Sequence, residues 1–139
     1  MVNMPEEVVK LINENPKAVK LLGTKSADGS VHVVPLGSIR AAGPNMIILG
    51  AILMHRTGAN LESMKSKGEL VSVVAVDGEK LAAFEVRAKV KDYQTAGPAF
   101  EGMNEAIKKM GLTLRGVWVL EPAEVWNQSA SYNAGKKMV

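Results

Sequence analysis

Apolar and polar residues alternate along several stretches of the chain, and a period of two predicts β-strands. Over residues 84–91 the even positions are apolar and the odd positions are charged, so one strand face is expected in the core. The run 46–53 is apolar throughout, which is typical of a strand buried on both faces. Together the patterns predict six strands, over residues 18–25, 31–40, 46–53, 69–76, 80–93 and 113–126.

Three other segments carry apolar residues three or four positions apart, which predicts amphipathic helices. The first covers residues 5–15, and the third follows Gly97 and Pro98. The second begins with Thr57 as its N-cap and ends near Gly68.

Turn residues at 26–30 and 77–78 predict hairpins between neighbouring strands. The expected fold is therefore mainly β with α: a compact six-stranded antiparallel β-barrel with flanking helices. No repeat or linker divides the sequence, so a single domain over residues 1–139 is expected. Its polar tail, residues 127–139, is expected to be loose unless something docks it.

Composition excludes several classes of chemistry. The chain has no cysteine, which rules out disulfides, thiolate catalysis and cysteine-based metal sites. Its two histidines form no metal-binding motif, and a structural or solvent-facing role is expected for both. The net charge of +3 is dispersed, so no nucleic-acid partner is expected. The longest apolar run is far shorter than the roughly 20 residues that span a bilayer, and a cytoplasmic protein without a membrane partner is expected.

The segment 54–64, which opens the second predicted helix, carries the strongest candidate for a binding site. A helix start presents unpaired N–H groups and a partial positive charge, and Arg56 and the Thr57 hydroxyl stand beside it. Such a group suits a phosphate, and Asn60, expected at position N3, would point toward the same ligand. The alternative is an ordinary cap beside a solvated arginine. No nucleophile-elbow pattern is present, so any chemistry is expected to come from a cofactor.

Trp118 and Trp126 lie eight residues apart in the last predicted strand, which places them on one face if the strand is regular. Pro122 lies between them and can break that register. The two indoles either fill the core, or one of them packs against a planar ring or a partner subunit.

Four stretches of the sequence resemble the FMN-binding split-barrel superfamily, the pyridoxamine 5′-phosphate oxidase-like proteins, and most closely its small single-domain members. The stretches are residues 31–36, 46–60, 84–101 and 116–122. The resemblance implies a split barrel that forms a homodimer, with FMN in a groove between the two subunits.

By the same resemblance, Arg56 and Thr57 hold the FMN phosphate, and Asn60 lies near the phosphate or the ribityl chain. The partner chain closes the site, with Trp118 or Trp126 as candidates. The remaining implied contacts follow the isoalloxazine on two strands: Gly50, Ala51, Ile52 and Leu53 on one, and Val33, Val34 and Pro35 on the other.

The function implied is that of a redox flavoprotein, either a flavin reductase or an electron-transfer protein with a small-molecule or protein redox partner. A reductase dependent on the deazaflavin F420 and a non-enzymatic flavin carrier or sensor are the alternatives. The substrate-binding basic residues of true pyridoxamine-phosphate oxidases are not recognisable in the sequence, so that activity is not expected.

Overall fold

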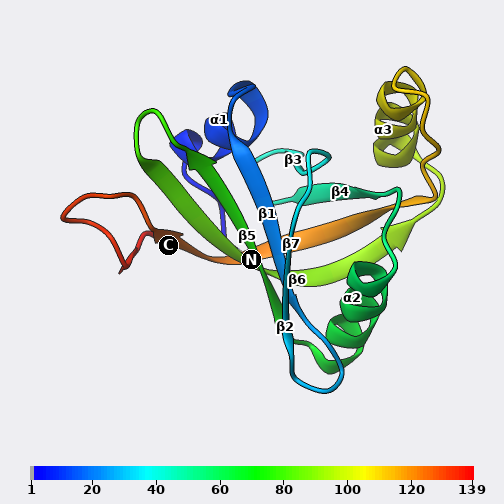
Figure 1. Ribbon diagram of the computed structural model, residues 1–139, viewed down its shortest axis with the longest axis horizontal. Coiled ribbons are helices and arrows are strands. Elements are labelled where there is room, and N and C mark those ends of the chain that lie inside the picture. Colours follow the sequence, from blue (N-terminus) through cyan, green and yellow to red (C-terminus); the bar gives the residue numbers. More distant parts are fainter. Residues whose placement is uncertain (1) are drawn as a thin grey trace.

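A single curved antiparallel sheet, with three helices around it, forms the computed structural model, which describes residues 2–139 (Figure 1). The helices are α1 (Glu6–Glu14), α2 (Arg56–Lys67) and α3 (Pro98–Lys108). The strands are β1 (Val19–Lys25), β2 (Val31–Pro35), β3 (Arg40–Ala41), β4 (Ile47–Ala51), β5 (Leu70–Asp77), β6 (Ala82–Gln94), β7 (Gly116–Asn127) and β8 (Lys136–Lys137).

The strand order is β2-β1-β5-β6-β7-β4-β3, and β8 pairs with β7 outside this path. Because β2 and β3 are the two ends of the order, the curled sheet forms a half-barrel that stays open along one side. The expected class, mainly β and antiparallel with flanking helices, is confirmed. The expected number of six strands is wrong, since β3 and β8 are two-residue strands without their own alternating pattern.

The predicted strand over 31–40 is interrupted in the structure. β2 ends at Pro35 and β3 begins at Arg40, so residues 36–39 form a loop that crosses the open side. Ser38 fixes this loop to the neighbouring strand, because its Oγ accepts a hydrogen bond of 3.1 Å from the Gly50 N–H. A side-chain acceptor thus takes the place of a strand partner at this point.

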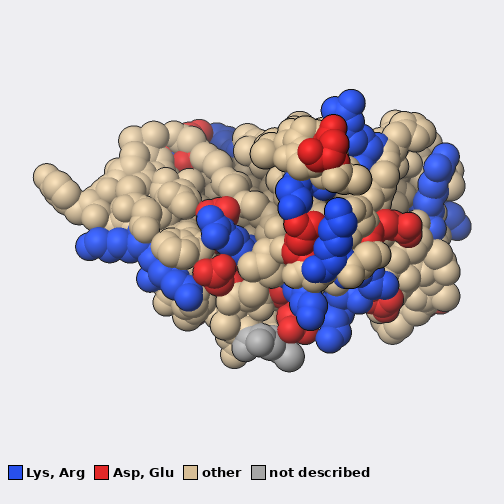
Figure 2. All heavy atoms as spheres, turned by 90° about the horizontal axis from the view of Figure 1, so that it is seen from below, with Lys and Arg blue, Asp and Glu red and all other residues tan. Residues whose placement is uncertain are grey.

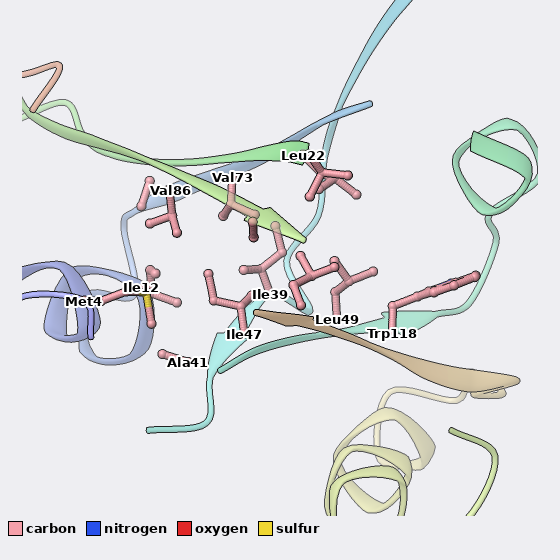
Figure 3. Packing of buried hydrophobic residues seen from close by; sticks show 14 of the residues in the cluster. Met4, Ile12, Leu22, Ile39, Ala41, Ile47, Leu49, Val73, Val86 and Trp118 are labelled. Carbon is pink, nitrogen blue, oxygen red and sulfur yellow. The ribbon is translucent and has the colours of Figure 1, made fainter. Parts of the chain in front are cut away.

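Most of the core lies inside the half-barrel, where Leu22, Ile47, Leu49 and Val73 are completely buried (Figure 3). Helix α1 covers one end of this core with its apolar stripe, as the sequence predicted; Val8, Leu11 and Ile12 are buried there. A second, smaller cluster lies under α3 on the other side of β4. It consists of Ile107, Leu114 and Val117, against which Ile48, Ile52 and Met103 pack.

The two tryptophans of β7 lie on opposite faces of the sheet. Opposite β6, Arg87 pairs with Glu124 and Ala88 pairs with Pro122, so the intervening residue of β7 is skipped in the register. This bulge inverts the alternation along the strand. Trp118 therefore joins the core. The Arg87 guanidinium lies over the Trp126 ring, with Arg87 Cζ 5.6 Å from the ring centroid.

The C-terminal tail is docked against the sheet, contrary to the expectation of a loose tail. The Gly135 N–H donates to the Asn127 carbonyl at 2.7 Å, and the Met138 N–H donates to the Val125 carbonyl at 2.7 Å. The chain returns along β7 and forms β8 there. Figure 1 shows this return (red) at the end of the sheet opposite α2 and α3.

Within residues 2–139, no helix combines the length and the apolar character that crossing a bilayer would require.

Candidate functional site

An apolar groove with a volume of about 620 Å³ lies between β4, the loop 36–39 and α3. Its polar side chains are Ser38 and Arg40, both beside the open side of the half-barrel. Its apolar lining comes from two sides: Pro35, Leu36, Ile48, Ile52, Leu53 and Met54 on the sheet side, and Ala99, Met103, Ala106, Ile107 and Met110 on α3 and the residues just after it. The groove is thus suited to a flat apolar group.

The close approach of α3 to β4 depends on Gly50. A Cβ atom at this position would lie 2.8 Å from Met103 Sδ and 2.9 Å from Leu114 Cδ1. Glycine therefore allows α3 to form the second wall of the groove. Met54, Met103 and Met110 line the walls, and methionine side chains adapt readily to the shape of a ligand.

Along the chain, the last groove-lining residues before α2 are Leu53 and Met54, and His55 separates them from the helix. The helix-start residues His55, Gly58 and Ala59 line a second hollow, which shares Met54 with the groove. α2 begins at Arg56, two residues earlier than the predicted N-cap at Thr57 implies, and His55 occupies the N-cap position without a side-chain cap. The first hydrogen bond of the helix runs from the Ala59 N–H to the His55 carbonyl, at 3.2 Å. The N–H groups of residues 56–58 precede it, so they are available to an anion beside the exposed guanidinium of Arg56.

The expectation that Thr57 is the N-cap is wrong, since Thr57 is the second residue of the helix. Its side chain is turned inward and is 5% exposed, and Thr57 Oγ1 lies 3.1 Å from His32 Nε2. Asn60 is also buried, one turn into the helix and not at N3. Asn60 Nδ2 donates to Thr24 Oγ1 at 3.0 Å.

These four residues form a polar seam between α2 and the β1–β2 hairpin, in which Thr24 and His32 are cross-strand partners. The seam fixes the position of the helix start, and it occupies the side chains of Thr57 and Asn60 with protein partners. His32 and Thr24 were missed as neighbours of the site by sequence reasoning. A period-two count places both on inward-facing positions, but their partners on α2 follow only from the tertiary fold.

The hairpin turn also brings a negative charge toward this end of the site. The pKa of the Asp28 carboxyl lies below its usual value, chiefly because the Ser30 hydroxyl and backbone N–H donate hydrogen bonds to it. The positive charge of Arg56 lowers the same pKa further. The guanidinium is therefore within electrostatic range of the turn and remains exposed to solvent.

The structure brings part of the predicted site together. Pro35, Gly50, Ile52 and Leu53 all line the groove, whereas Arg56 and Thr57 do not line it and follow Leu53 within four residues along the chain. The other predicted positions lie elsewhere. Val34 packs against the main core, Val33 is on the outer face of the sheet, and Ala51 lines a smaller hollow of about 380 Å³ on the other side of the helix start.

Neither tryptophan lines the groove. Trp118 is 4% exposed and packs against Tyr93, with the ring centroids 4.5 Å apart, and its edge borders the smaller hollow. Trp126 is half-buried near the docked tail.

Metal and nucleic-acid sites find no support in the described part of the chain. Residues 2–139 contain no cluster of three or more histidine, aspartate or glutamate side chains that suits a metal ion. On the face shown in Figure 2, basic and acidic side chains alternate over short distances, so no broad basic surface forms there.

The fold matches solved structures over nearly the whole chain. HupZ of Group A Streptococcus superimposes with a TM-score of 0.76 at 20% identity, over 97% of this chain and 100% of that one. An FMN-binding protein from Syntrophomonas wolfei gives a TM-score of 0.76 at 16% identity, over 91% and 86% of the two chains. An F420 reductase gives 0.63 at 18% identity, over 89% and 98%.

No protein-family model and no curated protein sequence matches the chain. The structural matches show that the chain shares its fold with these solved structures, in agreement with the split barrel that the resemblance in sequence predicted. Among proteins of this fold the named ligands differ, since the matches also include a heme binding protein from Mycobacterium smegmatis, with a TM-score of 0.60.

Proposed function

We propose that this protein is a flavoprotein of redox function that binds FMN, with the phosphate at the start of α2 and the ring in the groove. One observation carries the proposal: the groove residue Met54 also borders the hollow at the start of α2, where free N–H groups and the exposed guanidinium of Arg56 are found. FMN combines a flat ring with a dianionic phosphate, so its two ends match the two parts of this site.

The donor set fits a phosphate for three reasons. The N–H groups of residues 56–58 point out of the helix start, the helix dipole favours negative charge there, and Arg56 adds a full positive charge. Thr57 and Asn60 contribute mainly by fixing the position of the helix start, because their side chains hold α2 on the β1–β2 hairpin through His32 and Thr24. Arg56 and the backbone are thus the principal phosphate ligands in this proposal.

A bound flavin supplies the capacity to accept and release electrons, so the chain needs no catalytic acid or base of its own. The protein residues bind the cofactor, limit the access of water and orient the ring between β4 and α3. The electron donor and acceptor are a small molecule or another protein.

The active form is proposed to be a homodimer. Several large apolar side chains on the outer face of β1, β2 and β5 are exposed: Val19 by 52%, Val31 by 82%, Val33 by 57% and Leu70 by 41%. Val31, Val33 and Leu70 line one surface hollow together with Leu21 and Val74, and an exposed apolar surface of this kind suits an interaction. A second copy would cover it and shield a ring that one small half-barrel leaves open, with Trp118 or Trp126 of either chain as possible contacts.

The dimer is tested by molar mass in solution. We expect the protein to elute as a dimer by light scattering, and Val31→Glu to convert it to a monomer because a buried carboxylate is unfavourable at an apolar interface. Lys10→Glu, at an exposed position of α1, is the control and should leave the dimer intact. A monomeric wild-type protein would contradict this part of the proposal.

The cofactor is tested by the visible spectrum of the purified protein and by the mass of the molecule that heat releases. We expect a flavin spectrum or, for protein purified without cofactor, stoichiometric uptake of added FMN. Uptake of F420 or heme in place of FMN would move the assignment to another ligand of the same fold. No uptake of any of them would refute a cofactor-binding role.

A further inference from the structure

Two basic side chains, Lys20 of β1 and Arg40 of β3, lie next to each other, and Arg40 lines the groove. Arg40 Nη1 donates to the carbonyls of Gly37 and Ile39, each at 2.9 Å. Lys20 Nζ donates to the same Ile39 carbonyl at 2.7 Å and to the Ile12 carbonyl at 3.4 Å. The two cations are therefore held close together around one carbonyl oxygen.

No carboxylate partners this pair among residues 2–139, where the ion pairs involve other lysines and Arg87. Burial, and after it the positive charge of Arg40, together lower the pKa of Lys20 to about 8. Both hydrogen bonds of Arg40 use Nη1, which leaves Nη2 and Nε as donors for another acceptor. Two neighbouring cations without a counter-ion favour an anion beside them.

Arg40 is also one of the two polar side chains of an otherwise apolar groove, together with Ser38. We infer that Lys20 and Arg40 form a subsite for an anionic group, a carboxylate, sulfonate or phosphate, on a molecule whose apolar part lies in the groove. The subsite is separate from the start of α2. It goes beyond the proposed function by assigning a chemical class to a second ligand or reactant, and it depends on the groove and not on FMN.

A purely structural role is the competing explanation, since both cations also tie the loop 36–39 and the end of α1 to β1 through carbonyl oxygens. The two explanations predict different losses of binding affinity when one of the cations is removed. If the pair is only structural, every ligand of the groove loses affinity equally, whereas an anion subsite lowers the affinity of negatively charged ligands alone.

The test compares two fluorescent probes of nearly the same shape with the purified protein. 1-Anilinonaphthalene-8-sulfonate carries a sulfonate, and N-phenyl-1-naphthylamine lacks it. We expect Arg40→Gln and Lys20→Met each to raise the dissociation constant of the sulfonate probe about fivefold, as for a partly exposed charge contact. The neutral probe should bind all variants with unchanged affinity.

Two further variants guard against loss of folding. Arg40→Lys keeps the charge and should retain most of the sulfonate affinity, and Lys10→Gln removes an exposed charge on α1 and should change nothing. Equal losses for both probes, no loss for either, or a wild-type protein that binds neither probe would each overturn the inference. Sulfonate binding through this pair in a protein that takes up no flavin would support the inference and refute the proposed cofactor alone.

Discussion

Strand β4 separates two apolar regions that differ in how completely they are filled. On its inner face, Ile47 and Leu49 are fully buried in the main core of the half-barrel. On its outer face, Ile48 packs against the small cluster under α3, beside a groove of about 620 Å³. The same strand therefore serves stability on one side and offers space for a ligand on the other.

The comparison extends to the polar groups near each region. Beside the main core, the buried side chains of Asn60 and Thr24 are partners within the protein, joined by a hydrogen bond of 3.0 Å. Near the groove, the N–H groups of residues 56–58 and the Nη2 and Nε groups of Arg40 can still donate hydrogen bonds. Unused donors next to unfilled apolar space distinguish a candidate binding region from a merely packed one.

The largest effect is expected from truncation on the inner face. Leu49→Ala should lower the free energy of unfolding by about 2–5 kcal/mol, because it leaves a cavity in a closed core. Ile52→Ala, at the half-buried lining of the groove, should lower it by about 1 kcal/mol or less. Urea unfolding of both variants measures the contrast, and equal losses would mean that the two regions are packed alike.

A smaller loss of stability is expected in the polar seam. Asn60→Ala leaves the buried Thr24 hydroxyl without its donor and should cost about 1–3 kcal/mol. FMN affinity should change little at a temperature where the variant is folded, because Asn60 is turned away from the groove. A selective loss of FMN binding would show instead that Asn60 reaches the phosphate.

Gly50→Ala tests how closely α3 must pack on β4 for the groove to bind a ligand. The added methyl group would push Met103 and Leu114 away from β4, and overpacking of this kind costs on the order of 1 kcal/mol where a flexible side chain can yield. We expect weaker binding of FMN and of the neutral naphthylamine probe, with little change in unfolding. Gly58→Ala, whose added Cβ would make an ordinary contact of 3.6 Å, is the matched control for glycine replacement.

The smallest effect is the pH dependence of anion binding beside Lys20 and Arg40. Lys20 carries its charge below a pKa of about 8 and loses it as the pH rises through that value, while its neighbour Arg40 stays charged. Affinity for the sulfonate probe should therefore fall a few-fold between pH 7 and pH 9, in line with one weakened charge contact. Lys20→Met should remove this dependence, and a slope that persists would assign it to another group.

Local patterns in the sequence were sufficient for most of the fold. The alternation over 84–91 and the apolar run over 46–53 predicted β6 and β4, since these signals depend on neighbouring residues alone. The bulge opposite Arg87 and the docking of the tail involve residues from distant strands, so the two tryptophans and β8 could not be placed. β3 lacks a pattern because it has two residues.

The candidate site was likewise predicted only in part. Arg56 was predicted from the local signal of a helix start, and Gly50, Ile52 and Leu53 followed from the resemblance of the preceding strand to a known family. The inward turn of Thr57 toward His32, and the meeting of Lys20 with Arg40, depend on pairing between β1, β2 and the loop that follows. No period or motif in the sequence encodes such contacts.

The central claim is that the helix start binds the phosphate of a flavin, and a titration with FMN and riboflavin tests it most directly. Wild-type protein should bind FMN at least tenfold more tightly than riboflavin, which lacks the phosphate. Arg56→Ala should remove most of this preference and leave riboflavin affinity unchanged, whereas Lys65→Ala in the last turn of α2 should have no effect. Equal affinity of the wild-type protein for FMN and riboflavin would contradict the account.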